Sequence, residues 1–372
     1  MSTMPVFHQL VHTLSYGDAI STEVLALRET LRRLGYRSEI YALHEHPMYR
    51  GYTKQPEELE SESSAHIILH YSLGSSLNEI FARWSRGGRI LVYHNITPAR
   101  WYSEINKRVS DDIERGVEEL PALCAQSDAI WADSIFNAEE LKTYGDFSVE
   151  VLDLLVSDQR WTQPRDEKMF SSVAKSDGCQ VLHVGRIAPN KCLEDVIKTF
   201  YFLNKYRDPL SRLRLVGIDT DTEMYAFALR DLADRLGIGA RVEFTGALSD
   251  SEVRALYEAS DVYLCMSEHE GFCLPLIEAM HFSLPVVAYS AAAVPETLGE
   301  AGILIHEKRH AEIAKIIGRI REDSQLRGQL VHTGRARVSK YSMTRFSDRV
   351  QCLVELFCES DADKESKNAS CI

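Results

Sequence analysis

Cysteines in the C-x-x-C spacing are missing from this chain, although eight cysteines are scattered along its 372 residues. Without that spacing, neither a zinc site nor a dithiol redox motif is expected. Several cysteines stand in apolar runs, such as Cys265 in DVYLCMS, where a small buried thiol is the simpler interpretation. Reduced thiols in a chain of this length are typical of the cytoplasm.

Long apolar runs and an excess of positive charge are missing as well. No stretch approaches the ~20 apolar residues of a membrane-spanning helix, and the opening MSTMPVFHQLVHTL lacks the basic region of a signal peptide. The formal net charge is -13 at pH 7, and no basic tail is present. We therefore expect a cytoplasmic protein that binds no nucleic acid, in which phosphate binding would need a local group of cations.

The fingerprint of nicotinamide-binding enzymes is also missing, because no expected strand is followed by G-x-G-x-x-G. Gly237-Ile-Gly239 follows a helical segment instead and is expected to end it. Asp219-Thr-Asp221 has the spacing of a metal-binding acidic pair, but it follows an expected strand in a loop where acidic helix caps are common. We favour the cap over the metal site.

What the chain does have is the composition of a globular protein, with 45% hydrophobic and 26% charged residues, and the length of two domains. Short apolar runs alternate with longer amphipathic segments, which indicates α/β structure with parallel sheets covered by helices. The strands expected in the first half are 6–11, 38–43, 66–71, 89–95, 129–134 and 149–155. Those expected in the second half are 180–185, 212–217, 242–246, 261–266, 285–289 and 302–305.

A polar, turn-rich segment over 158–178 separates the two series and is expected to be a linker. We therefore predict two doubly wound, Rossmann-like domains, the first over 1–165 and the second over 176–340. They are expected to face a cleft at the carboxyl ends of their strands. A C-terminal helix over 345–358 is expected to join the first domain, and 359–372 is expected to be disordered.

The first candidate site is the loop that follows the strand ending at Gly185. Its sequence, HVGRIAPNK, places Arg186 and Lys191 within six residues of each other, so that both cations could reach one polyanion. The alternative is a solvated loop with two ordinary surface charges.

The second candidate site is EGFCLPLIEAM, which follows the strand 261–266. Gly271 allows an unusual turn, Pro275 suits the first turn of a helix, and Glu270 and Glu278 suit hydrogen bonds to sugar hydroxyls. The backbone amides at the helix start would form a seat for a diphosphate; they belong to Phe272, Cys273 and Leu274. The alternative is a helix cap followed by a solvated glutamate.

Together, VGRIAPNK and SEHEGFCLPLIEAMHFSLPVVAYSAAAVPETLGEAGILI resemble the retaining GT-B glycosyltransferases of family four, also called glycosyltransferase group 1. The hallmark of that family is E-x7-E, matched by Glu270 and Glu278. The resemblance covers roughly 180–305. In the first half it rests on VYHNITP and ADSIFNAEEL.

The resemblance implies a role for each matching residue. Arg186 and Lys191 would bind the donor diphosphate, Glu270 the donor sugar and Glu278 the ribose. His94, at a strand end in the first half, would approach the sugar from the opposite wall. A packed histidine at a strand end is the alternative for His94.

Gly17, in the first strand-to-helix loop, would let the backbone approach the phosphates or the acceptor. The chain departs from the family pattern at Ala292-Ala293, where two glycines are common, and by having one glycine in the first loop. These departures leave the sugar open. The donor hypothesis is mannose from GDP-mannose.

The resemblance further implies retention of anomeric configuration and no metal or cofactor, with the nucleotide-diphosphate sugar as co-substrate. The first domain would bind the acceptor and the second the nucleotide sugar. YHNITPARWYSEIN resembles bacterial enzymes of lipopolysaccharide or capsule synthesis, whose acceptors are glycans or lipid-linked oligosaccharides. Peripheral contact with the inner membrane could then involve basic and aromatic residues; these are Arg83, Arg86, Arg89, Arg100, Trp101, Tyr102, Lys107 and Arg108.

Three alternatives stay open at this point. A solvated helix with a buried aromatic would explain the basic and aromatic residues without a membrane. A sugar-nucleotide epimerase of similar fold would convert the donor without an acceptor. An inactive scaffold would bind the nucleotide without turning it over.

Overall fold

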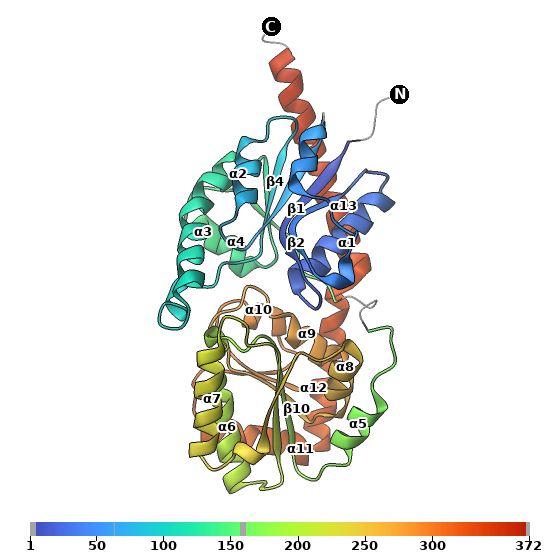
Figure 1. The fold of residues 1–372 in the computed structure, drawn as a ribbon. Helices are drawn as coiled ribbons and strands as arrows, with labels where there is room; N and C mark the ends of the chain where they lie inside the picture. Colours follow the sequence, from blue (N-terminus) through green and yellow to red (C-terminus); the bar gives the residue numbers. More distant parts are fainter. Residues whose placement is uncertain (1–4, 63, 157–160, 370–372) are drawn as a thin grey trace. The chain divides into compact units, whose positions relative to one another are not determined.

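A computed structural model of the protein describes residues 5–62, 64–156 and 161–369, with backbone alone over 362–369. The chain folds into two compact units. Unit 1 comprises Met1–Ile96, Asp111–Leu155 and Tyr341–Ile372, and unit 2 comprises Thr97–Ser110 and Val156–Lys340. Each unit is built around one parallel sheet (Figure 1).

The sheet of unit 1 has six parallel strands in the order β2-β1-β3-β4-β5-β6. Gln9 in the central part of β1 lies opposite Ile40 of β2 and Ile68 of β3. The strands are β1 (Phe7–Leu14), β2 (Ile40–Glu45), β3 (His66–Tyr71), β4 (Arg89–Tyr93), β5 (Ala129–Ala132) and β6 (Val149–Val151). The helices are α1 (Ala19–Arg33), α2 (Ser76–Arg83), α3 (Lys107–Gln126), α4 (Ile135–Lys142) and α13 (Met343–Ala369).

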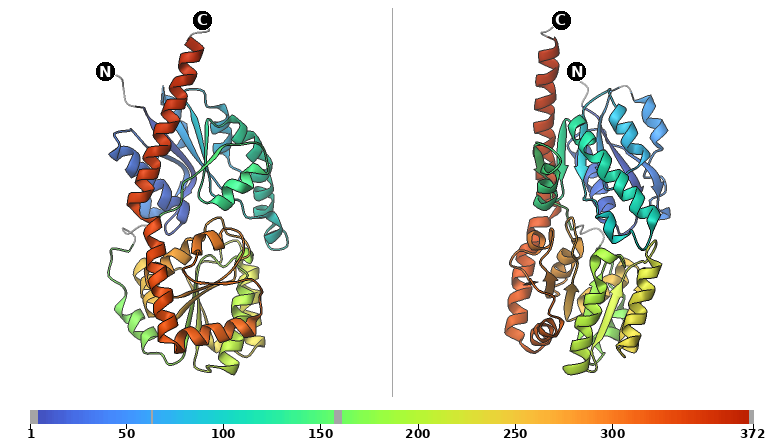
Figure 2. Two further views of the ribbon diagram at one scale, coloured as in Figure 1. Left: turned by 180° about the vertical axis from the view of Figure 1, so that it is seen from behind. Right: turned by 90° about the vertical axis from the view of Figure 1, so that its left-hand side faces the viewer.

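The last helix, α13, packs beside α1 and shares the apolar core of unit 1 (Figure 2). Leu27 and Leu31 of α1 and Val350 of α13 are fully buried in that core. The helix continues to Ala369, so the expectation of disorder from 359 is wrong as far as 369. The segment ESDADKESKNA contains no proline or glycine that would end a helix already held by the packing of its first turns. Residues 370–372 lie outside the described residues.

The sheet of unit 2 also has six parallel strands, in the order β12-β11-β10-β7-β8-β9. Its strands are β7 (Gln180–Val184), β8 (Arg212–Val216), β9 (Val242–Gly246), β10 (Val262–Cys265), β11 (Val286–Tyr289) and β12 (Ile303–Ile305). Every strand that the alternation predicted is present, and the prediction of two doubly wound α/β sheets is confirmed.

Two helices of unit 2 begin where residues of their first turn predict. Ser249 Oγ accepts from Glu252 N while Glu252 accepts from Ser249 N, a reciprocal pair that starts α8. Pro275 lies in the first turn of α9, as expected. The helices are α5 (Glu167–Ala174), α6 (Leu193–Tyr206), α7 (Glu223–Arg235), α8 (Asp250–Ala259), α9 (Leu274–His281), α10 (Val294–Leu298), α11 (His310–Glu322) and α12 (Ser324–Val338).

Much of the expected linker over 158–178 is part of unit 2, because it carries α5, which packs on α8. Asp166 caps this helix by accepting from Met169 N at 2.6 Å. Arg165 Nη1 lies 2.7 Å from Glu258 Oε2 of α8. A turn-rich composition therefore marked the boundary of the unit, but its polar residues serve as a cap and an ion pair. Residues 157–160 lie outside the described residues.

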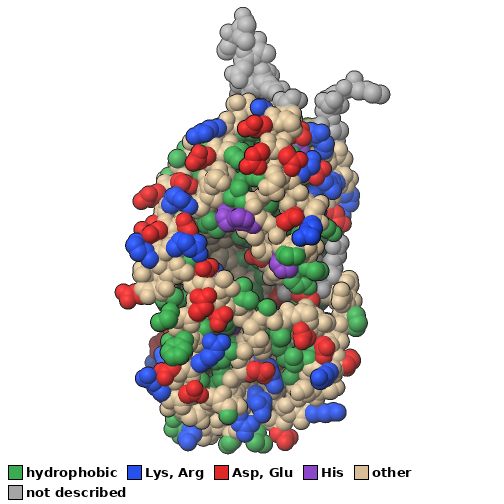
Figure 3. Space-filling view, in the orientation of Figure 1, with side chains coloured by type: hydrophobic (Ala, Val, Ile, Leu, Met, Phe, Trp, Pro, Cys, Tyr) green, Lys and Arg blue, Asp and Glu red, His purple; other side chains and the backbone are tan. Residues whose placement is uncertain are grey.

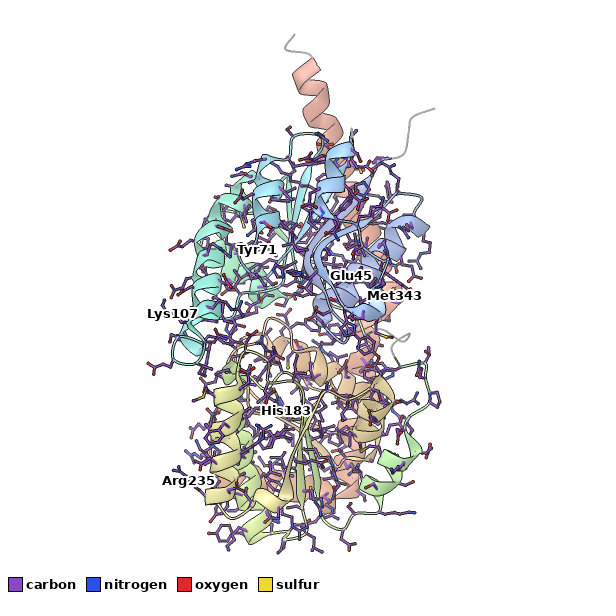
Figure 4. The ribbon with its side chains drawn as sticks, in the orientation of Figure 1. Glu45, Tyr71, Lys107, His183, Arg235 and Met343 are labelled. Carbon is purple, nitrogen blue, oxygen red and sulfur yellow. The ribbon has the colours of Figure 1, made fainter. Side chains whose placement is uncertain are left out.

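A second departure from the expected domains is the segment 97–110, which belongs to unit 2 although its neighbours on both sides belong to unit 1. Trp101 packs against the apolar core of unit 2. Asn106 Nδ2 donates to Asp221 O at 3.2 Å, and Arg108 Nη2 lies 2.9 Å from Asp221 Oδ1. Lys107 marks this end of α3 in Figure 4. Partial burial of Trp101 against this core supports the alternative to a membrane contact at this aromatic.

The surface mixes charges of both signs. Acidic, basic and apolar side chains are interspersed on the visible face of both units (Figure 3). Within the described part of the chain, no helix combines the length and the apolar composition needed to cross a bilayer. The described cysteines are free thiols, and Cys265 is fully buried in β10 as expected.

Candidate active site

Lys191 and Glu270, one from each motif of the second half, form an ion pair in unit 2. Lys191 lies in the turn after β7, and Glu270 lies between β10 and α9. The ammonium Nζ lies 2.7 Å from Glu270 Oε1 and 2.6 Å from Oε2. The side chains are 20% and 8% exposed, respectively. The two motifs therefore meet at the carboxyl ends of neighbouring strands.

The charges of this pair support each other. Burial alone would raise the pKa of Glu270, but the Lys191 ammonium outweighs burial and holds the pKa below its ordinary value. Burial likewise works against the charge of Lys191, and the Glu270 carboxylate raises the Lys191 pKa above its ordinary value. Both groups are therefore ionised at neutral pH.

Asn190 ties the two loops together and was missed in the sequence, where an asparagine after Pro189 reads as part of a turn. Its Nδ2 donates to His269 O at 2.9 Å, and its backbone oxygen accepts from Glu268 N at 2.9 Å. Asn190 is 5% exposed. Because it holds the backbone on both sides of Glu270's loop, it positions the acid that meets Lys191.

His183, the histidine of β7, lies among the strands of unit 2 (Figure 4). Burial lowers its pKa to about 4, so the ring is neutral at neutral pH. Its Nδ1 lies 3.0 Å from Leu264 O, which a neutral ring satisfies only by donating from Nδ1. The ring stacks on Tyr263 with a centroid distance of 5.8 Å. His183 is therefore held by its contacts with β10.

The start of α9 adopts an unusual backbone, although not at the expected residue. The left-handed residue is Cys273, at φ 73°, rather than Gly271. The turn is held by Ala293 N, which donates to Glu270 O at 3.2 Å, and by Thr297 Oγ1, which donates to Phe272 O. Leu274 then begins the helix.

Glu278 lies within α9 and is 3% exposed. Tyr257 donates its hydroxyl to Glu278 Oε2 at 2.9 Å. A solvated glutamate, which was the alternative for this residue, is therefore excluded. The carboxylate is held in one orientation by an aromatic residue of α8.

Arg186 is directed to a different loop from Lys191. Its Nη2 donates to Thr220 O at 2.7 Å and lies 3.7 Å from Asp221 Oδ2. Asp221 is the residue that also pairs with Arg108. The two cations that we expected to reach one polyanion therefore have different partners, because the loop after β8 competes for Arg186. In the sequence, Asp221 was considered as a helix cap or as part of a metal-binding pair, not as a partner of Arg186.

In unit 1, Gly17 lies in the loop between β1 and α1 with φ 77°, a conformation that glycine adopts readily. Asp18 caps α1 directly after it by accepting from Ser21 N at 3.0 Å. The expected glycine turn is thus present at the carboxyl end of β1.

His94 follows β4 and is buried among polar groups. Its Nε2 lies 2.8 Å from His70 Nδ1, and its Nδ1 lies 3.6 Å from Glu23 Oε2 and 3.7 Å from Asp133 Oδ2. Only 1% of the side chain is exposed. Its three neighbours were missed in the sequence, although each is a titratable residue inside an apolar run: TEVLAL, HIILHY and AIWADS.

Burial raises the pKa of Glu23 to about 8. Burial alone would lower the pKa of His94, but the nearby carboxylates, first Glu23 and then Asp133, raise it above its ordinary value. Burial also raises the pKa of Asp133, whereas it lowers the pKa of His70 well below its ordinary value.

Three groups of described side chains come close enough to hold a metal ion. They are Glu23 with His70 and His94, Cys265 with Glu270 and Cys273, and Cys192 with Glu194 and Asp195. In the first group, the two imidazole nitrogens are at hydrogen-bond distance, 2.8 Å. Ligands of a tetrahedral zinc ion lie about 3.4 Å apart. The first group therefore fits a hydrogen-bonded pair better than a metal site.

The other two groups have competing partners. Both carboxylate oxygens of Glu270 face Lys191. Asp195 lies 2.8 Å from Lys308 Nζ and 2.9 Å from His310 Nε2. Cations of the protein thus already compensate these carboxylates, which does not favour a metal ion.

Comparison with known proteins shows what the second half of the chain is similar to. Residues 164–337 match the sequence model of the family Glycosyl transferases group 1. The MMP alpha-(1->4)-mannosyltransferase of Mycolicibacterium hassiacum is 29% identical over 243 residues, which are 64% of this chain and 53% of that protein. The O-antigen chain mannosyltransferase B of Escherichia coli is 26% identical over 43% of this chain and 42% of that protein. The match thus spans about half the length of the first relative and less than half the length of the second.

The fold has solved counterparts. The crystal structure of Anabaena Alr3699/HepE in complex with UDP and glucose superposes with a TM-score of 0.72 at 17% identity, over 94% of this chain and 99% of the other. At this identity the likeness concerns the fold alone. Residues 164–337 are thus similar to the glycosyl transferases of group 1, and the chain has the GT-B fold.

Proposed function

We propose that this protein transfers a sugar from a nucleotide-diphosphate donor to a glycan or lipid-linked acceptor, with retention of configuration and without a metal. The observation that carries the proposal is the partly buried Lys191–Glu270 pair beside the start of α9. It combines a fixed cation for a phosphate with a fixed carboxylate for sugar hydroxyls. The match of residues 164–337 to the model of the group 1 family supports it.

The chemistry follows from the charges. Breaking the bond between the anomeric carbon and the phosphate oxygen leaves extra negative charge on the diphosphate. Lys191 and the amides of Phe272, Cys273 and Leu274 are the groups that would stabilise it, each well-aimed donor contributing about 3 kcal/mol. The acceptor hydroxyl forms the new bond on the same face, and its proton passes to a phosphate oxygen of the leaving group.

The carboxylates have separate tasks in this proposal. Glu270 accepts hydrogen bonds from the transferred sugar, and Glu278 accepts from the ribose while Tyr257 holds its other side. Arg186 reaches the diphosphate by leaving Thr220 and Asp221. Unit 2 is the nucleotide-sugar unit, and unit 1, with Gly17 and His94, serves the acceptor side.

The donor we propose is GDP-mannose, because the two relatives described above are named mannosyltransferases. UDP-glucose is the second candidate, since the HepE structure holds UDP and glucose. The name of the Escherichia coli relative supports a setting in cell-surface polysaccharide synthesis, where peripheral membrane contact would bring the enzyme to its acceptor.

A thermal-shift panel with UDP, GDP and ADP, followed by transfer assays with the matching sugars, tests the proposal. A nucleotide at a hundred times its dissociation constant should add about 2.7 kcal/mol of stability. Sugar transfer that is lost in Lys191→Ala and Glu270→Ala, while both variants stay folded, is the expected result. Full activity in either variant would overturn these roles. Conversion of the donor sugar without any acceptor would indicate an epimerase, and nucleotide binding without turnover a scaffold.

A further inference from the structure

A row of buried hydrogen bonds in unit 1 leads from the backbone of α1 to His94. Gln9 Nε2 donates to Val24 O at 3.1 Å. Gln9 Oε1 lies 2.9 Å from His70 Nε2, and His70 Nδ1 lies 2.8 Å from His94 Nε2. The rings of His70 and His94 stack at an interplanar angle of 16°.

The direction of each bond follows from the first. Because the amide nitrogen of Gln9 is used by Val24, its Oε1 faces His70 and accepts, so His70 Nε2 carries a proton. Burial keeps His70 neutral, and its Nδ1 must therefore accept. His94 Nε2 then carries the proton of the last bond. A single tautomer of His94 remains if the ring is neutral, the one with its lone pair on Nδ1.

The second ring nitrogen of His94, which takes no part in this row of hydrogen bonds, faces carboxylates. His94 Nδ1 lies 3.6 Å from Glu23 Oε2, on α1, and 3.7 Å from Asp133 Oδ2, after β5. Asp18, in the loop before α1, is a third acid whose field reaches His94. His70 is the other titratable group in contact with the ring, and it is neutral.

Charge balance in the buried site favours protonation of Nδ1. A buried carboxylate without a compensating cation is energetically costly. Among the residues that the structure describes, no lysine or arginine forms an ion pair with Glu23 or Asp133. An imidazolium at His94 opposite one ionised acid, with the second acid protonated, leaves the three groups neutral. Burial that raises the Glu23 pKa to about 8 agrees with this arrangement.

We propose that Glu23 and Asp133 are positioning residues that hold His94 as an imidazolium, while Gln9 and His70 fix its orientation, so that His94 serves sugar transfer by its charge. This inference rests on the proposed function. It differs from direct contact with the sugar, because both ring nitrogens face groups of unit 1 and the side chain is 1% exposed. A fixed charge in a low-dielectric interior acts over several ångströms.

The test measures the histidine directly. The full chain, labelled with 15N at histidine, is examined by long-range 1H–15N correlation between pH 5.5 and 9.5, with His94→Gln and His70→Gln used to assign the two rings. The expected result is that His94 carries protons on both nitrogens at pH 7 while His70 stays neutral with its proton on Nε2. A neutral His94 at pH 7 would overturn the inference.

The positioning role is tested with the isosteric variants Glu23→Gln and Asp133→Asn, each checked for folding by its thermal transition. The variant that removes the ionised acid should lower the midpoint of the His94 titration by at least about one pH unit, since an opposite charge within ~4–6 Å raises a histidine pKa on this scale. Replacing the protonated acid should shift the midpoint less. If the variant of the ionised acid does not fold, the direct measurement of the protons on His94 still decides. Unchanged midpoints in both variants contradict the inference.

Enzyme kinetics distinguish a positioning role of these residues from an effect on protein stability alone. The basic limb of the kcat profile, measured with GDP-mannose and UDP-glucose as donors, should move to lower pH in the variant, Glu23→Gln or Asp133→Asn, that shifts the titration of His94. His70→Gln, which keeps a hydrogen-bond acceptor, should retain more activity than His70→Leu. If the wild type turns over neither donor, the proposed function fails for these donors and the catalytic part of this inference fails with it. A shifted titration without a shifted kcat profile would overturn the inference alone.

Discussion

Glu270 offers both oxygens of its carboxylate to a single ammonium, that of Lys191, which lies 79 positions earlier in the chain. The two loops that carry these residues are held by Asn190, which bonds to the backbone at Glu268 and His269. The pair is therefore positioned before a ligand arrives. Such preorganised charges lower a barrier without reorganising during the reaction.

Replacing Lys191 by alanine should lower kcat about 10² to 10³-fold, the effect of removing one aimed donor of positive charge. The binding of nucleotide should weaken less, because the α9 amides remain. Steady-state kinetics and a thermal shift with GDP measure the two effects. Lys198→Ala is the matched control, since this lysine is 41% exposed and pairs with Asp195 within its own helix. Equal losses in both variants would contradict the role of Lys191.

The buried acid of unit 1 should make the protein less stable as the pH rises. The folded-state pKa of Glu23 is raised from 4.5 to about 8, so the folded protein binds this proton more tightly than the unfolded chain does. The stabilisation is complete below pH 4.5 and is lost between that value and pH 8, by at most about 1.4 kcal/mol per pH unit. His94 and Asp133, whose pKa values are also raised, act in the same direction.

Glu23→Gln isolates this contribution, because glutamine has the same shape and no titration. Urea unfolding at pH 5, 6.5 and 8 should show a smaller fall in the free energy of unfolding for the variant than for the wild type. Parallel falls in the two proteins would show that Glu23 does not retain its proton on folding.

Asp221 should hold Arg186 back from an anionic ligand. The carboxylate lies 3.7 Å from Arg186 Nη2, a partner that a diphosphate must replace. Asp221→Asn should therefore tighten the binding of GDP or UDP, by about fivefold at most, since an exposed ion pair is worth up to ~1 kcal/mol. Calorimetric titration measures the change. Asp219→Asn, which affects the pair with Arg230 instead, serves as control and should leave the affinity unchanged.

Cys273 occupies a left-handed conformation, at φ 73°, where a side chain costs about 1 kcal/mol or more relative to glycine. Cys273→Gly should therefore melt higher than Cys273→Ala by about 2–4 °C. The two variants both lack the buried thiol, so their difference reports the backbone conformation together with a single methyl group. Scanning calorimetry decides the order, and a more stable alanine variant would mean that the loop relaxes to another conformation.

The alternation of apolar runs with amphipathic segments was enough to place the strands, because strands buried on both faces of a sheet must be apolar throughout. Helix ends were equally readable where a local bond decides them, as at Ser249 and Pro275. The E-x7-E motif placed Glu270 before α9 and Glu278 within it. These features depend on residues that are close together in the chain, so the order of residue types is enough to predict them.

Other features depend on residues that are distant in the sequence. Segment 97–110 lies in unit 2 because Trp101 finds an apolar core there and Asp221 binds Asn106 and Arg108. Arg186 donates a hydrogen bond to the loop after β8 and so does not share a partner with Lys191. The sequence of a polar segment does not indicate which distant residues it will contact. The contacts of segment 97–110 and of Arg186 could therefore not be predicted from residue spacing.

His94 shows the division most clearly. The order of residue types predicts two parallel α/β sheets, the motifs at their strand ends and a histidine at the end of β4. It does not predict that this histidine faces Glu23, Asp133 and His70, which come from α1, the end of β5 and β3 and meet only in the folded protein. Local propensity sets the elements, whereas the charge and orientation of a buried group are set by side chains that folding alone brings within a few ångströms.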